Sequence, residues 1–382
     1  MDFQRLVDAI NFTGVVSGLT HDFYRYPARF SPLVARAAIE SFTLPGNTIL
    51  DPFSGGGTSL VEALALGRHA VGVDISRLAV YLAKVKTLLL DEDELDIILD
   101  WAIDVTPDLS PRKPVERHWE WKEAGYQENL PWRFRKVAEQ AINSAGELPD
   151  RLQPIARCVV LRTVQWGVDC KKRLPTAAEF RARMVEHAVA MTHGLKALAE
   201  KVRASGQRAT IEAFHGPADE IGTMPSKLLL RSPPKLVVTS PPYPGTHVLY
   251  HRWQVFGRRE TSAPFWIADC QDGQGSAFYT FGDRRNQKHE KLYFGTLLRT
   301  FIEIRKVVSD DAYIVQLVGF GKPNDHIPLY RDAMREAGFK EHECEGHRPS
   351  QFWRSVPNRK WYTWLRDETK QTSEVLLVHR PA

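Results

Sequence analysis

The sequence predicts an α/β domain built on a parallel sheet and interrupted by a helical insertion. Strand and helix patterns alternate near the start of the chain, over residues 47–90, and strand patterns return after residue 208. Between these blocks, residues 115–204 show helical patterns and no convincing strand. Strands that alternate with helices form parallel sheets, so the two outer blocks are expected to share one sheet.

The first block has four elements in order. Residues 47–53 (NTILDPF) form a short apolar strand that leads into a glycine-rich turn. Residues 59–67 have helical spacing and end on Gly67, a suitable helix cap. Residues 69–76 form a second strand and residues 77–90 a second helix. This β-α-β-α order is the start of a parallel sheet.

The pattern breaks after residue 90. An acidic run (DEDELD) is followed by VTPDLSPRKP, whose three prolines are typical of a linker. Further strands are predicted at 208–216, 235–243, 312–320 and 373–380, and a further helix at 291–308. We therefore divide the chain into a sheet domain, residues 1–95 and 205–382, and a helical basic insertion, residues 96–204.

Composition is that of a globular protein, with 43% hydrophobic and 25% charged residues among 382. No apolar run is long enough to span a bilayer, and the start MDFQRLVDAINF lacks the apolar core of a secretory signal. We therefore expect a cytoplasmic protein with no membrane partner. The four cysteines are scattered and form no CxxC pair, which favours reduced thiols. The spacing of His342, Cys344 and His347 matches no common zinc site, so no metal is expected.

Positive charge is concentrated in one part of the chain. The net charge is +5, and residues 110–210 contain 19 Lys and Arg against 11 Asp and Glu, a surplus of 8. A basic segment on a slightly acidic remainder suggests a polyanionic partner. A solvated helical surface is the simpler alternative.

The turn DPFSGGGTS (51–59) lies between a predicted strand and a helix. Its three glycines let the backbone approach a ligand closely, and the helix that follows offers N–H groups to an anion. The turn lacks the lysine of a P-loop and the spacing of GxGxxG. The next strand ends on Asp74, which can accept hydrogen bonds from ribose hydroxyls or cap the following helix. The pattern indicates a ligand with a ribose and a small anionic end, such as S-adenosylmethionine; a tight connection alone is the alternative.

Three stretches resemble motifs of the amino-group (N4-cytosine and N6-adenine) DNA methyltransferases. DPFSGGGT resembles their cofactor motif, and TSPPY their catalytic motif in the serine form typical of the N4-cytosine branch. HDFYRYPARFSP (21–32) resembles the N-terminal motif that closes over the methionine end of the cofactor. The resemblance covers residues 21–92 and 209–320 and the last strand. It implies a Rossmann-like methyltransferase fold, with a mostly parallel seven-stranded sheet and helices on both faces, and S-adenosyl-L-methionine as cofactor.

The resemblance also implies which residues bind the cofactor. These are Arg29, Phe30, Ser31, Asp51, Phe53, Gly55, Gly57, Thr58, Asp74 and Asp219. The family often has an acidic residue directly after the third strand, whereas here Pro217 follows Gly216, and Asp219 is expected to replace that residue in contacting the adenine amine. The insertion before the third strand fits the named classes of the family only loosely.

The residues Ser240, Pro241, Pro242 and Tyr243 form the predicted catalytic turn. An exocyclic amine is a poor nucleophile until its nitrogen becomes tetrahedral, and the Ser240 hydroxyl and Pro241 carbonyl can accept its two hydrogens. The prolines hold that carbonyl rigidly, and Tyr243 can stack on the base, which must be flipped out of the duplex. No cysteine follows a proline, so the nucleophile of C5-cytosine methylation is missing.

From these residues and the resemblance, we expect a site-specific DNA methyltransferase that modifies cytosine N4. An N6-adenine enzyme of the same build is the first alternative, and an inactive subunit that binds cofactor and DNA is the second. DNA is the expected partner, and a cognate restriction nuclease is left open. Three segments rich in Trp and Arg compete for target recognition: the insertion (HWEWKE and PWRFRKV), residues 247–261 and residues 351–368. The insertion is favoured, and simple packing of the tryptophans is the alternative.

Overall fold

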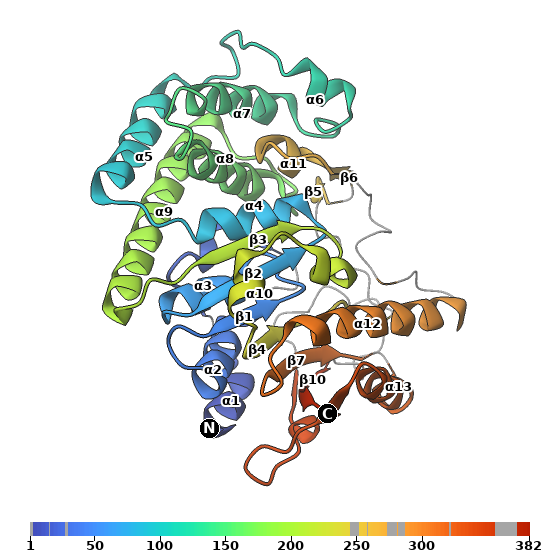
Figure 1. Ribbon diagram of the computed structural model, residues 1–382. Helices are drawn as coiled ribbons and strands as arrows, with labels where there is room; N and C mark the ends of the chain where they lie inside the picture. Colours follow the sequence, from blue (N-terminus) through green and yellow to red (C-terminus); the bar gives the residue numbers. More distant parts are fainter. Residues whose placement is uncertain are drawn as a thin grey trace.

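The centre of the molecule is a twisted sheet with helices on both faces and a further helical layer above it in Figure 1. The structure is a computed structural model that describes residues 3–14, 16–26, 30–244, 252–257, 259–272, 281, 287–320, 322–355 and 373–382. In these ranges the main sheet has eight strands. They are β1 (Thr48–Asp51), β2 (His69–Asp74), β3 (Ile211–His215), β4 (Leu236–Thr239), β7 (Tyr313–Gly319), β8 (Phe339–Glu341), β9 (Trp353–Ser355) and β10 (Ser373–Pro381).

Strand order explains how distant parts of the chain meet. The order is β3-β2-β1-β4-β7-β10-β8, with β9 paired to β10. Strands β1, β2, β3, β4 and β7 run parallel, whereas β10 runs antiparallel to its neighbours. This confirms the predicted Rossmann-like α/β fold with a mostly parallel sheet. The described sheet has eight strands where seven were expected, because the short strand β9 also pairs with β10. Because β1 and β4 are neighbours, the turns that follow them leave the sheet at the same edge.

Each face of the sheet is covered by its own set of helices, so the inner strands are buried on both sides. One face packs against α1 (Phe3–Asn11), α2 (Pro32–Phe42), α3 (Thr58–Ala65) and α4 (Arg77–Lys86). The other packs against η3 (Ala218–Thr223), α10 (Lys227–Arg231), α12 (Gln287–Val307) and α13 (Pro323–Glu336). Successive residues of β1 show the alternation, since Ile49 enters the first core and Leu50 the second.

The helical layer lies over α4 (Figure 1). It consists of α5 (Glu92–Val105), η2 (Thr106–Asp108), α6 (Trp119–Glu123), α7 (Trp132–Ala145), α8 (Gln153–Val168), α9 (Ala177–Ser205) and α11 (Ala263–Ile267). Its apolar core is continuous with that of α4 and residues 23–26. The acidic run after residue 90 is not a break, because Asp91 and Glu94 form a capping box that starts α5. The boundary expected at residue 95 therefore falls inside a helix.

A small hairpin, β5 (Trp253–Val255) and β6 (Arg259–Thr261), joins the helical layer soon after the predicted catalytic turn. The Cys170 amide, just after α8, donates to the Gln254 carbonyl at 2.8 Å. The remaining short elements are η1 (His21–Phe23) and η4 (Pro349–Gln351). The hairpin thus packs on the helical layer.

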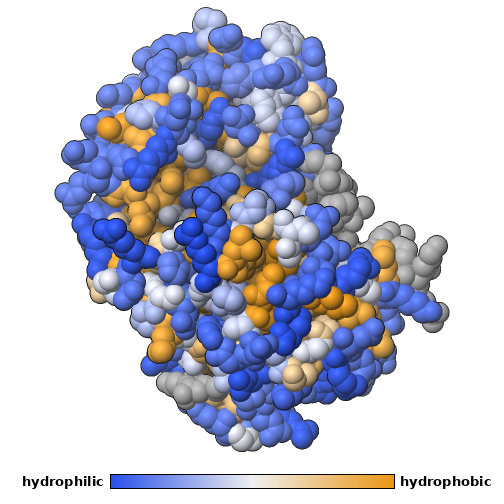
Figure 2. All heavy atoms as spheres, in the orientation of Figure 1, coloured by the Kyte–Doolittle hydropathy of each residue, from blue (hydrophilic) through white to orange (hydrophobic). Residues whose placement is uncertain are grey.

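The surface in Figure 2 is largely hydrophilic, with apolar side chains reaching it in separate places. One such place lies over α10 and α12, whose exposed apolar side chains include Leu230, Leu292 and Ile302. Of the helices described, none is both long and apolar enough to cross a lipid bilayer.

Candidate active site

The glycine-rich turn and the S-P-P-Y turn meet at the ends of β1 and β4. The Thr239 hydroxyl, one residue before Ser240, donates a 2.6 Å hydrogen bond to Asp51. Asp51 also accepts from the Ser59 hydroxyl and, at 3.2 Å, from the Phe53 amide. Burial raises the pKa of Asp51 to about 6, although these hydrogen bonds favour its ionised form. One buried carboxyl therefore fixes both turns to each other.

The glycine-rich turn lacks side chains at Gly55 and Gly57 because neighbouring residues pack closely against its backbone. Gly57 has a φ of +78°, and a Cβ there would lie 2.8 Å from the backbone of Ala83 in α4. Gly55 has a φ of +48°, and a Cβ there would lie 3.4 Å from the Tyr26 ring. Both positions thus combine a left-handed conformation with a close approach, which favours glycine. Thr58 begins α3 directly after this turn and is buried.

Asp74 lies at the tip of β2, beside the glycine-rich turn. Its Oδ2 accepts the Gly55 amide at 2.9 Å and its Oδ1 accepts the Ser76 amide at 2.8 Å. Burial raises the pKa of this carboxyl to about 6. An ionised carboxylate has about four acceptor positions, so two remain for ligand hydroxyls. The position and donor chemistry of Asp74 fit the ribose of S-adenosyl-L-methionine, and the side-chain-free turn next to it fits a ligand that lies against backbone.

The segment at residues 20–26 covers the glycine-rich turn and is tied down by several elements. His21 Nε2 lies 2.7 Å from the buried Glu62 carboxylate of α3. The Gln165 amide of α8 both accepts from the Arg25 N–H and donates to the Arg25 carbonyl, each at 3.0 Å. The Trp253 indole of β5 donates to the Tyr24 hydroxyl at 2.9 Å. Neither Glu62 nor Gln165 belongs to a short motif, so the sequence alone gives no signal for their roles.

The other residues of the predicted N-terminal motif lie next to this segment. Phe30 packs against the α1 and α2 core, and the Ser31 carbonyl accepts the Ala35 amide at 3.0 Å, which starts α2. Arg29 lies outside the described residues. Tyr26, which is outside the predicted cofactor set, is the residue of this motif that lies against Gly55.

Two further predicted cofactor residues are Phe53, within the glycine-rich turn, and Asp219, after β3. The Phe53 ring is 5.5 Å from the Phe281 ring, centroid to centroid. Asp219 lies in η3, after β3, and forms a 3.4 Å ion pair with Arg299 of α12. Its carboxylate thus already has a cationic partner, and the adenine contact stays a prediction.

The S-P-P-Y turn is held by hydrogen bonds to two strands, β7 and β10, and to a helix, α12. The Ser240 hydroxyl donates to the Leu317 carbonyl at 2.9 Å and lies 3.0 Å from the Tyr243 hydroxyl. The Tyr293 hydroxyl of α12 donates to the Pro242 carbonyl at 2.8 Å. Over the described part of the chain, no hydrogen-bond donor reaches the Pro241 carbonyl. The turn is thus fixed by these bonds, and the buried Pro241 carbonyl has no hydrogen-bond partner among the described residues.

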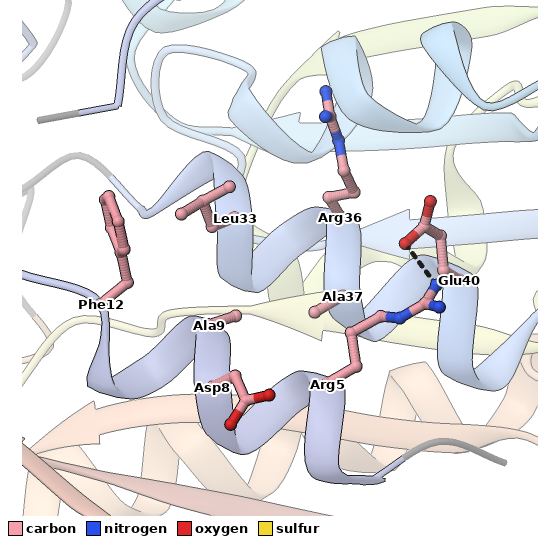
Figure 3. A pocket seen from close by; sticks show the side chains of 8 residues that line it. All are labelled: Arg5, Asp8, Ala9, Phe12, Leu33, Arg36, Ala37 and Glu40. Atoms are coloured by element: carbon pink, nitrogen blue, oxygen red, sulfur yellow. Dashed lines mark hydrogen bonds and ion pairs between the residues drawn. The ribbon is translucent and has the colours of Figure 1, made fainter. Parts of the chain in front are cut away.

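Another hollow lies between α1 and α2 and contains none of the predicted site residues (Figure 3). Its lining residues are Arg5, Asp8, Ala9, Phe12, Leu33, Arg36, Ala37 and Glu40. Arg5 and Glu40 form a 2.8 Å ion pair across it. In the ranges that the structure describes, no group of three His, Cys, Asp or Glu side chains is arranged to hold a metal. The predicted site residues thus converge at the ends of β1 and β4, and not in this hollow.

Comparison with known proteins finds similarity in the part of the chain that carries the glycine-rich turn. A family model described as DNA methylase matches residues 11–85. The chain is 31% identical over 90 residues to the Type II methyltransferase M.MjaII of Methanocaldococcus jannaschii, covering 24% of this chain and 17% of that protein. It is 39% identical over 80 residues to the Type II methyltransferase M.MvaI of Kocuria varians, covering 20% of this chain and 18% of that protein. The chain thus matches less than a fifth of the length of these curated relatives.

A solved structure of a SAM-dependent methyltransferase from Agrobacterium tumefaciens also resembles the chain at 12% identity. The comparison covers 94% of this chain and 65% of that one, with a TM-score of 0.33. The family model includes residues 21–32, the glycine-rich turn and Asp74, whereas the S-P-P-Y turn lies beyond it.

Proposed function

We propose that this chain, whose residues 11–85 match the amino-group DNA methylase family, transfers a methyl group from S-adenosyl-L-methionine to cytosine N4 in DNA. The family match and the curated relatives support a DNA methyltransferase and S-adenosyl-L-methionine as its cofactor. The observation that carries the proposal for this site is the Asp51–Thr239 hydrogen bond, which holds the S-P-P-Y turn beside the glycine-rich turn. Serine as the first residue of that turn favours cytosine over adenine.

The chemistry at this site is alignment and hydrogen bonding. The bound cofactor supplies a methyl group activated by the positive charge on its sulfur. The Ser240 hydroxyl and the Pro241 carbonyl accept the two hydrogens of the target amine, which favours a tetrahedral nitrogen. Tyr293 holds the Pro242 carbonyl from the other side, so the turn keeps its geometry during the reaction. The target base must leave the duplex to reach this edge of the sheet.

A cluster of arginines beside the site supports contact with DNA phosphates. Arg162 of α8 is half-buried, and its guanidinium lies 3.5 Å from the Gln165 side chain that clamps Arg25. Burial and the neighbouring Arg25 lower the pKa of Arg162 to about 10, and in the described residues no carboxylate lies within ion-pair distance of it. Unpaired cations of this kind favour an anionic partner.

Two tryptophans of the helical layer support the insertion as the region that reads the target. Trp119 and Trp132 are each more than half exposed, whereas Trp101 of the same layer is buried. Arg117 lies 4.6 Å from the Trp119 ring centroid, and Arg133 lies 5.4 Å from that of Trp132. Packing therefore accounts for Trp101 and leaves the other two available for bases or phosphates. Of the competing segments, residues 247–251, 258 and 356–368 lie outside the described residues. In the described part of the first segment, Trp253 is buried and donates to the Tyr24 hydroxyl, so packing accounts for it.

The test is to incubate the purified chain with labelled S-adenosyl-L-methionine and mixed-sequence DNA, and to digest the DNA to nucleosides for mass spectrometry. We expect N4-methyldeoxycytidine as the product. If the product is N6-methyldeoxyadenosine, the proposed methyl transfer stands but the target base is adenine and not cytosine. Retention of both cofactor and DNA without methylated product would instead favour the inactive binding subunit.

A further inference from the structure

We propose that Glu374 is a positioning residue that sets the direction of the hydrogen bonds around Ser240. Glu374 belongs to the last strand, β10, and lies 131 residues from Tyr243, so no motif connects it to the S-P-P-Y turn. The inference rests on the proposed function, because it concerns how Ser240 becomes a hydrogen-bond acceptor for the target amine.

Glu374 is a buried carboxylate, 4% exposed, whose two oxygens have different partners. Its Oε2 accepts from Arg354 of β9, at 2.7 Å from Nε and 2.6 Å from Nη2. Its Oε1 accepts from the Tyr243 hydroxyl at 2.5 Å. A carboxylate in such an ion pair can only accept, so the single hydroxyl hydrogen of Tyr243 is directed to Glu374.

Strand pairing brings these residues together. Glu374 is opposite Arg354 in the β10–β9 pair and opposite Gly319 in the β10–β7 pair. A Cβ on Gly319 would lie 2.7 Å from the Tyr243 ring, so the ring occupies the space that glycine leaves over β7. The tyrosine is thereby fixed with its hydroxyl between Ser240 and Glu374.

The direction of the Ser240 hydrogen bond follows from the partners that surround it. The Leu317 carbonyl can only accept, and the Tyr243 hydroxyl has already committed its hydrogen to Glu374. Ser240 must therefore donate its own hydrogen within the protein, which leaves its oxygen lone pairs for an incoming N–H. Without the carboxylate, the Tyr243 hydrogen can turn to Ser240, 3.0 Å away, and occupy a lone pair that the substrate needs.

The first test is Glu374→Gln, which keeps the size of the side chain but allows an amide N–H to face Tyr243. We expect kcat to fall by about 10-fold to 100-fold, the range for losing one charge-assisted hydrogen bond, with cofactor Kd unchanged. Glu341→Gln is the matched control, since Glu341 of the adjacent strand β8 is ion-paired to Arg331 at 3.1 Å away from the turn. That control should retain wild-type kcat, and thermal unfolding of both variants should show that each is folded.

The second test is the double variant Glu374→Gln with Tyr243→Phe, which removes the hydroxyl hydrogen that would otherwise turn to Ser240. We expect it to transfer methyl groups faster than Glu374→Gln alone and at the rate of Tyr243→Phe alone. A purely structural role for Glu374 predicts the opposite, a further loss in the double variant. Full activity of Glu374→Gln would overturn the inference and leave the proposed function standing. So would losses of Glu374→Gln and Tyr243→Phe that add up in the double variant. An inactive wild-type chain would overturn both the inference and the proposed function.

Discussion

The Thr239 hydroxyl donates a 2.6 Å hydrogen bond to the Asp51 carboxylate. These residues end β4 and β1, two neighbouring parallel strands that lie 188 residues apart in sequence at this contact. Asp51 leads into the glycine-rich turn, and Thr239 leads into the S-P-P-Y turn. A single buried carboxyl thus sets the relative position of the proposed cofactor-binding and amine-binding groups.

Replacing this carboxyl should change how stability depends on pH. Burial raises the pKa of Asp51 from 3.8 to about 6, so the folded chain binds the proton more tightly than the unfolded chain. The stability from this proton is complete below about pH 4 and is lost as pH rises through about 6. For Asp51→Asn, the free energy of unfolding relative to wild type should therefore rise by about 2 kcal/mol from pH 4 to pH 7.5.

Chemical denaturation at the two pH values measures this difference. Asp104→Asn is the control, because Asp104 is exposed on α5 and should show no such change. A constant difference between Asp51→Asn and wild type would contradict the assigned burial.

Loss of the Ser240 hydroxyl should abolish transfer without affecting cofactor binding. Ser240→Ala removes one of two acceptors for the target amine, and we expect kcat to fall by about 100-fold or more. Cofactor Kd from calorimetry should stay at the wild-type value. Ser309→Ala is a matched control, since the Ser309 hydroxyl bonds to the Pro234 carbonyl at the opposite edge of the sheet. Undiminished turnover by Ser240→Ala would show that the role assigned to this hydroxyl is wrong.

Cofactor affinity should fall as pH is lowered through the pKa of Asp74. Burial raises this pKa to about 6, and only the ionised carboxylate can accept from both ribose hydroxyls. Between pH 7.5 and pH 5 we expect Kd to increase by about 10-fold. Asp74→Asn should bind weakly at pH 7.5 and lose most of the pH dependence. Equal wild-type affinity at both pH values would remove Asp74 from the proposed cofactor site.

Arg162 should contribute to the salt dependence of DNA binding. If its guanidinium contacts one phosphate, Arg162→Gln should reduce the slope of log Kd against log salt by about 0.9. Fluorescence anisotropy with a duplex over a range of salt concentrations gives the slope. Arg335→Gln is the control, because Arg335 pairs with Asp332 on α13 at 3.0 Å. Identical slopes for wild type and Arg162→Gln would exclude this contact.

The sequence predicted the elements whose patterns are local. The strands around 47–53, 69–76, 235–243, 312–320 and 373–380 appear where apolar and β-branched residues cluster. Three-residue strands such as β8 and β9 were not identified, because such short segments carry no periodicity and depend on pairing with β10. The start of α5 was misjudged for a related reason, since its acidic residues act as a cap and not as a charged break.

The residues of the candidate site also fall into those that the sequence predicted and those that it did not. Ser240, Asp51 and Asp74 belong to short motifs and were found in the sequence. Glu374 and Tyr293 were not found, because they reach the S-P-P-Y turn from 131 and 51 residues away along the chain. Such contacts are set by strand pairing and helix packing, for which the sequence near the turn gives no signal.

The last strand, β10, lies inside the sheet between β7 and β8. Residues of β8 precede β10 in the chain, yet β8 is linked to the rest of the sheet only through β10. A nascent chain that ends before residue 373 would contain the glycine-rich turn and Ser240 but would lack the carboxylate next to Tyr243. The proposed hydrogen-bond arrangement around Ser240 would therefore be completed only when this last strand has joined the sheet.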